Sequence, residues 1–249
     1  LQGVIVSWSR QDPGAALAYA HSLPAVDQGK AARAIGGIWA NETLADARAK
    51  LAELPEGPLR TGFMEGFCGV LANKSPTEAA ALVSAMPAGG AQARTAVRVA
   101  AQWALKDPGA AAAWVSGFPV GDMRQQAIKG VVEMWVGKDS EAAAAWVRQF
   151  PQGKERDSGV DAIVNHQVWQ NPAVAAAWVS EIYDPSQRTA LVKMVGQAWH
   201  QIDRQAAERW LEQMGVSAEE RNQILKSPSG SPFDECMFSP VLTDDDFGE

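Results

Sequence analysis

Apolar and polar positions along the chain follow a pattern that returns about every 32 residues. The two clearest copies run Trp103-x3-Asp107-Pro108-x5-Trp114-x3-Phe118-Pro119 and Trp135-x3-Asp139-x6-Trp146-x3-Phe150-Pro151. Self-similarity at 20 to 50 residues is typical of stacked supersecondary units. The pattern therefore predicts a repeat protein before any single residue is considered.

Each copy opens with a small polar residue that suits a helix N-cap, because its side-chain oxygen can accept a backbone N–H of the first turn. These residues lie 31 apart once and 32 apart five times, at Asp12, Thr43, Ser75, Asp107, Asp139, Asn171 and Asp203. Proline suits the first helical position, and it directly follows four of them, at Pro13, Pro76, Pro108 and Pro172. We expect the first helix of each unit to begin here.

Within this first helix, offsets 4, 7, 8 and 11 from the cap form one apolar stripe. Offset 4 is alanine in every copy, which predicts a close helix crossing: Ala16, Ala47, Ala79, Ala111, Ala143, Ala175 and Ala207. Proline then ends the helix in five copies, at Pro24, Pro55, Pro87, Pro119 and Pro151.

A second helix follows a short polar turn and runs to the residue four before the next cap, as in residues 122–135 and 186–199. We expect its N-caps at Asp27, Asp122 and Ser186, and a capping box at Ser217 and Glu220. Two such helices bury too little surface to be stable alone, so the units must stack on one another.

The expected fold is therefore all-α, an α-solenoid of about seven two-helix repeats over residues 1–226. Leu1 lies eleven residues before Asp12, so residues 1–8 correspond to the end of a second helix. We expect the first repeat to be truncated on its N-terminal side, as in a fragment or a processed chain.

The segment Asp107-Pro-Gly-Ala-Ala-Ala-Ala-Trp114 resembles the opening of a tetratricopeptide unit. The period here is 32 residues, and Ala and Trp fill the family's Gly and Tyr positions in the first helix. HEAT-like stacking describes the pattern nearly as well. The resemblance implies a protein-interaction scaffold and carries over no ligand site.

The formal charge of −7 is concentrated at the C-terminus, because residues 227–249 hold six acidic residues and no Lys or Arg. A nearly neutral remainder without a basic stripe predicts no nucleic-acid binding. No run of about eighteen apolar residues occurs, which predicts no membrane span. These features leave the cellular location open.

Periodicity stops after Lys226, where residues 227–232 form a Pro/Ser linker. The acidic segment that follows contains large apolar residues, chiefly Phe233, Met237, Phe238 and Phe247. We interpret residues 233–249 as a docking segment that binds another protein or the solenoid of this same protein. A disordered acidic end is the alternative.

A recurring arginine lies seventeen residues past four of the caps, at Arg60, Arg124, Arg156 and Arg188. Arginine near the start of a helix opposes the helix dipole, so its recurrence needs a reason. Stacking on a tryptophan or pairing with an acid of the next unit is one interpretation. A groove that binds a carboxylate-rich partner is the other.

Other candidate chemistry is sparse. Nine of the ten tryptophans fall on repeat registers, which favours core packing, and only Trp169 lies off register. The three histidines show no metal-binding spacing, and no nucleophile or nucleotide-binding motif occurs. We expect no cofactor and no catalytic residue. Cys68 and Cys236 could pair in an oxidising compartment, although two free thiols are the simpler interpretation.

These observations favour a binding scaffold that holds a protein or peptide partner on the solenoid face or through its C-terminal tail. One alternative is a spacer or regulatory segment of a longer, even enzymatic, chain. A ligand- or carbohydrate-binding helical domain is another, with a site at the off-register residues Asn165, His166 and Trp169.

Overall fold

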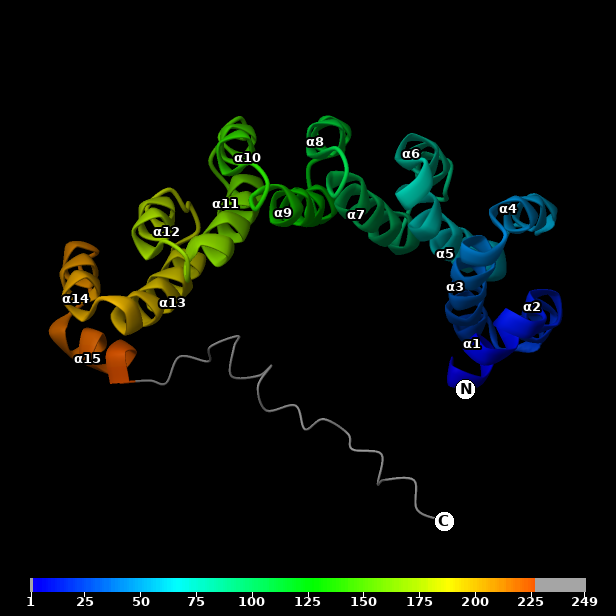
Figure 1. Ribbon diagram of the computed structural model, residues 1–249, viewed down its shortest axis with the longest axis horizontal. Helices are drawn as coiled ribbons and strands as arrows, with labels where there is room; N and C mark the ends of the chain where they lie inside the picture. Colours follow the sequence, from blue (N-terminus) through cyan, green and yellow to red (C-terminus); the bar gives the residue numbers. More distant parts are fainter. Residues whose placement is uncertain (1, 227–249) are drawn as a thin grey trace, which may run out of the picture. The chain divides into compact units, whose positions relative to one another are not determined.

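The computed structural model describes residues 2–226 of the chain. Within them every regular element is an α-helix, and no strand occurs. The predicted all-α class is thereby confirmed. Two compact units make up the chain, Leu1–Ile163 and Val164–Glu249, with the boundary inside helix α11. Each unit is described by itself below (Figure 1).

The first unit opens with α1 (Gln2–Gln11), which packs against α2 and α3. The first helices of its repeats are α2 (Pro13–Ser22), α4 (Leu44–Glu53), α6 (Pro76–Ser84), α8 (Pro108–Ser116) and α10 (Ser140–Val147). The second helices are α3 (Ala25–Glu42), α5 (Pro58–Lys74), α7 (Gly90–Ala104), α9 (Asp122–Trp135) and α11 (Lys154–Gln167). In Figure 1 the first helices of this unit lie in one row and the second helices in another.

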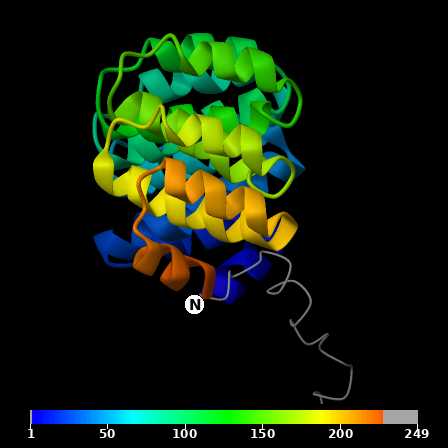
Figure 2. The same ribbon diagram turned by 90° about the vertical axis from the view of Figure 1, so that its left-hand side faces the viewer.

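The second unit contains α12 (Pro172–Val179), α13 (Pro185–Ile202), α14 (Arg204–Gln213) and α15 (Ala218–Lys226). The long helix α13 contacts the other three (Figure 2). Helix α14 buries Ala207, Trp210 and Leu211 and exposes charged residues on its opposite face. The amphipathic pattern of the first helices therefore continues into this unit.

All seven predicted caps are confirmed as the N-cap residues of the first helices. In five of them the side chain accepts a backbone N–H of the first turn. Asp12 Oδ1, for example, lies 2.8 Å from Ala15 N, and Asp107 Oδ1 lies 2.9 Å from Ala110 N. Thr43 and Ser75 hold the cap position without this bond.

The predicted caps of the second helices are wrong. Asp27 and Asp122 lie inside the first turns of α3 and α9, and Asp184, not Ser186, caps α13. Four of these turns place a glycine with positive φ fourteen residues past the first-helix cap, at Gly57, Gly89, Gly121 and Gly153. A side chain is strained at such a φ, which favours glycine at these four positions. The capping box of Ser217 and Glu220 is confirmed, with both N–H···O distances at 3.2 Å.

The alanine at offset 4 is fully buried in all seven copies, as the repeat predicts. A close backbone approach, however, lies between the second helices α3 and α5. A Cβ added at Gly66 would fall on the carbonyl oxygen of Arg33 and lie 2.6 Å from Gly37 N. A Cβ at Gly62 would likewise meet the backbone of Gly29. Glycines therefore set the spacing of these two helices.

All ten tryptophans are buried or half-buried, which confirms the packing interpretation. A tryptophan four residues before a cap meets the aromatic residue seven past it in four copies. The ring centroids lie 5.7 to 6.1 Å apart in the pairs Trp8–Tyr19, Trp103–Trp114, Trp135–Trp146 and Trp199–Trp210. The aromatic residues thus join each second helix to the first helix that follows it.

Candidate functional site

Three of the four recurring arginines, Arg60, Arg124 and Arg188, lie against the ends of the preceding first helices. Arg60 Nη1 donates to Leu54 O at 2.8 Å, Arg124 Nη1 to Phe118 O at 3.1 Å, and Arg188 Nε to Ile182 O at 3.0 Å. Each acceptor stands at offset 11, one to three residues past the last residue of the first helix. Carbonyls at a helix C-terminus lack intrahelical partners and carry the negative end of the dipole. These guanidinium groups therefore cap the helices.

Other repeats use different side chains for the same purpose. Gln28 Nε2 donates to Leu23 O at 2.9 Å, Gln92 Nε2 to Val83 O at 3.1 Å, and Arg221 Nη1 to Val216 O at 3.0 Å. These residues break the arginine pattern because two of them are glutamines, and because Gln28 and Arg221 lie one position away from offset 17. Their common signal is a long polar side chain sixteen to eighteen residues past the cap.

The structure thus explains the recurrence of these arginines by an intramolecular contact. Arg124 is further held by Glu155, with Nε–Oε1 and Nη2–Oε2 distances of 2.8 and 2.5 Å. The hydrogen bond to Glu155 raises the pKa of Arg124. Arg156 lies half-buried at the start of α11. A partner-binding role for these arginines stays a prediction, and Phe233, Met237, Phe238 and Phe247 lie outside the described residues.

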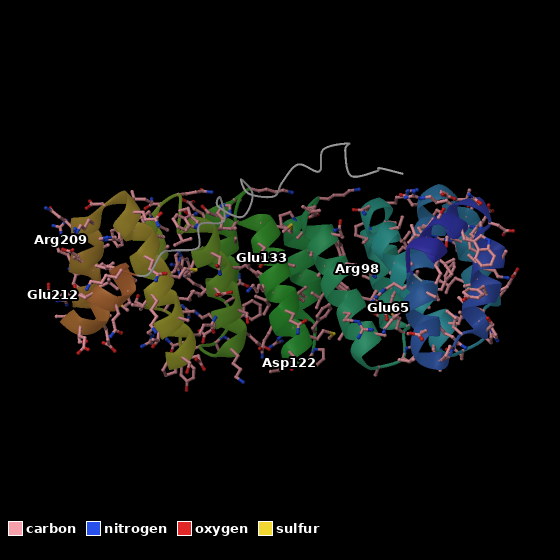
Figure 3. All side chains as sticks on the ribbon, turned by 90° about the horizontal axis from the view of Figure 1, so that it is seen from below. Glu65, Arg98, Asp122, Glu133, Arg209 and Glu212 are labelled. Atoms are coloured by element: carbon pink, nitrogen blue, oxygen red, sulfur yellow. The ribbon has the colours of Figure 1, made fainter. Side chains whose placement is uncertain are left out.

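A second cluster of arginines, which the sequence analysis did not identify, surrounds Glu65 on α5. The Glu65 side chain is only 8% exposed. Arg94 Nη2 on α7 lies 3.0 Å from Glu65 Oε1, and Arg33 Nη1 on α3 lies 3.5 Å from Oε2. Arg98 donates to the backbone carbonyl of Glu65, and Figure 3 shows these two residues together. One carboxylate therefore lies among three guanidinium groups from neighbouring helices.

Beside this cluster the surface is hollowed over about 430 Å³. The lining residues come from α3, α5 and α7 and are Val26, Gly29, Lys30, Arg33, Pro58, Thr61, Gly62, Glu65 and Arg94. Arg33 and Arg94 keep 40% and 61% of their side-chain surface exposed. Lys30 is exposed as well, so the rim is cationic. The lining also includes Val26, Pro58 and two glycines.

An ion pair also occupies the positions equivalent to Arg33 and Glu65 three repeat periods further along the chain. Lys129 Nζ on α9 lies 2.7 Å from Asp161 Oδ2 on α11. The hydrogen bond to Asp161 raises the pKa of Lys129. Glu65, Lys129 and Asp161 all stand 22 residues past their caps. The shared offset of these charged residues is the sequence signal that could have revealed this row.

The off-register residues lie close together in the sequence around the end of α11. Asn165 and His166 lie in the last turn of α11, and Trp169 follows in the turn before α12. Among residues 2–226 no group of three His, Cys, Asp or Glu side chains could hold a metal ion. Nor does any helix in that range have the length and apolarity that a membrane span needs.

Cys68 is a free, fully buried thiol on α5. Burial raises its pKa to about 12. Whether Cys236 is also a free thiol stays a prediction, since Cys236 lies outside the described residues. Comparison of the chain with protein-family models, curated proteins and solved structures finds no match.

Proposed function

We propose that residues 1–226 form an α-solenoid of helical hairpins, of the tetratricopeptide or HEAT-like class, that binds a protein or peptide partner. The binding surface is the row of second helices in the first unit. The observation that carries the proposal is the hollow beside Glu65, with its exposed cationic rim. Repeat proteins use such continuous helical faces to hold extended partners.

The chemistry of this hollow supports binding better than a reaction. Its charged groups are mainly guanidinium groups, which recognise carboxylates through paired N–H donors. Glu65, the one acidic residue of the lining, is already paired with Arg33 and Arg94. The expected partner is therefore an acidic segment of a protein, with apolar residues that contact the floor of the hollow.

Affinity capture from a native extract tests the proposal with three forms of the full chain: unchanged, Arg94→Glu and Arg48→Glu. Arg48 is the matched control, since it lies on α4 in the other row and pairs with Glu78 on the surface. We expect a partner that the unchanged chain and the Arg48→Glu variant retain and the Arg94→Glu variant loses. A partner that all three forms retain would contradict this binding surface.

A further inference from the structure

We propose that the hollow beside Glu65 is the docking site for the C-terminal segment of this same protein, residues 233–249. The inference rests on the proposed function, because it assigns an occupant to the same surface. Three properties of the hollow and the segment carry it: excess positive charge, apolar surface next to that charge, and the complementary composition of the segment.

The hollow and its border carry more positive than negative charge. Lys30, Arg33 and Arg94 line it, and Arg98 adjoins it through the backbone of Glu65. Glu65 is the only acidic residue among the lining residues. Four cations beside one carboxylate leave a local excess of three positive charges. A bound anion relieves this excess, and an arginine offers several N–H donors in a planar array.

Apolar surface lies directly beside these cations. Val26 is 71% exposed, and Pro58 lines the same hollow with the backbones of Gly29 and Gly62. A valine exposed to this degree gains free energy when an apolar side chain covers it. The best occupant therefore carries an aromatic or aliphatic residue next to an acidic one.

Residues 233–249 have this composition. Phe233 precedes Asp234 and Glu235, and Phe247 follows Asp246. The segment contains six acidic residues and no Lys or Arg, whereas the rest of the chain is nearly balanced at 22 basic and 23 acidic residues. Opposite charges on the segment and the hollow favour their association and make it sensitive to salt.

The segment is tethered to the chain by the six residues 227–232. An extended chain spans about 3.3 to 3.6 Å per residue, so residues 227–249 reach at most about 80 Å beyond Lys226. A tether raises the effective concentration of a segment at every site within its reach. Docking of this kind competes with any external acidic partner for the same hollow.

The two cysteines allow a direct test in the full chain. Cys68 is buried and its pKa is raised to about 12, so a thiol-reactive spin label under reducing pretreatment is directed to Cys236. We expect paramagnetic broadening of the backbone amide signals of Lys30, Thr61 and Arg94. The broadening should disappear in the Arg33→Glu variant and at high salt, and should persist in the Arg48→Glu control.

Broadening confined to other residues, broadening that survives Arg33→Glu, or no broadening would each overturn the proposal. Added poly-glutamate should release the segment. Release by an oligonucleotide but not by poly-glutamate would overturn the assignment to an acidic peptide.

A mixture of two forms of the chain shows whether docking occurs within one molecule or between two. One form is isotope-labelled and carries Cys236→Ser, and the other is unlabelled and carries the spin label. Broadening in this mixture indicates docking onto a second copy, and its absence indicates docking within one molecule. Both arrangements place the segment in the hollow and support the proposal.

The spin-label experiment and the affinity capture can fail independently of each other. Capture of an external partner that depends on Arg94, without docking of residues 233–249, would leave the scaffold function standing and remove this inference. Docking of the segment without any captured partner would keep this inference and remove the external partner.

Discussion

Two junctions between second helices occupy the same register and are built in different ways. At α3 and α5, glycines bring the two backbones together around the pair Arg33–Glu65. At α9 and α11, three periods later, Gln125, Ser158 and Ala162 replace Gly29, Gly62 and Gly66 around the pair Lys129–Asp161. The Glu65 side chain is 8% exposed, whereas that of Asp161 is 18% exposed.

At both junctions the ion pair occupies equivalent positions, and its carboxylate is less exposed where glycines bring the two backbones together. At the α3–α5 junction the carboxylate of Glu65 is buried, and Arg94 from α7 pairs with it in addition to Arg33. The α9–α11 junction uses one lysine that stays 45% exposed. Excess positive charge therefore accumulates only at the glycine-built junction of these two.

The largest expected effect is that the Cys68 thiol reacts much more slowly than a free thiol. Cys68 lies on α5, one of the two helices of the glycine-built junction. Its pKa of about 12, against an ordinary value of 9.0, lowers the thiolate fraction about a thousandfold. Alkylation by iodoacetamide at pH 8, followed by mass spectrometry, should be slower than for a free thiol by at least that factor. Rapid alkylation of native Cys68 would mean that α5 opens readily.

Gly66→Ala should break the close junction. The added methyl group meets the backbone of Arg33 and Gly37, which cannot move aside as a side chain would. Overpacking of this kind costs about 3 kcal/mol of unfolding free energy, measured by urea denaturation. Gly130→Ala on α9 is the matched control, because its nearest contact is Ala101 Cβ at 3.5 Å. The control should gain up to about 1 kcal/mol, and equal losses in both variants would contradict the comparison.

Removing the negative charge of Glu65 or of Asp161 should destabilise the protein to different extents. Glu65→Gln leaves Arg33 and Arg94 without their buried counterion and should cost about 2 kcal/mol. Asp161→Asn removes a more exposed partner of Lys129 and should cost less than about 1 kcal/mol. Thermal unfolding of both variants measures the difference. A larger loss of stability in Asp161→Asn than in Glu65→Gln would contradict the expectation that the more deeply buried carboxylate contributes more.

The smallest effect concerns alkaline pH. Asp161 raises the pKa of Lys129 above its ordinary 10.5, so the folded state holds this proton more tightly than the unfolded state. The stabilisation is present below pH 10.5 and is lost as the pH rises through the raised pKa. Stability curves of the unchanged chain and Lys129→Met should therefore converge above that pH. The gap at neutral pH should be about 0.5 kcal/mol, as for exposed pairs.

Much of the helical layout follows from sequence alone. The first-helix caps and the buried alanines recur at fixed offsets, so their periodicity identifies them without reference to contacts. The predicted second-helix caps lie one to three residues inside the helices, because the residue before each helix is Pro24 at α3, Gly121 at α9 and Asp184 at α13.

The Glu65 cluster depends on contacts between repeats. Arg94 and Glu65 are 29 residues apart, and Arg33 and Glu65 are 32 apart. Sequence spacing alone does not show that three helices converge on one carboxylate. The recurring arginines were found from their spacing, but their role as helix caps required the positions of the carbonyl oxygens.

These caps have a consequence for how such a chain can change length. A long polar side chain at the start of the second helix closes the first helix of its own repeat, as Arg60 does for Leu54 and Arg124 for Phe118. A block of 32 residues that begins at an N-cap contains both halves of this contact. Duplicating or removing one such block by design therefore keeps every cap with its own helix.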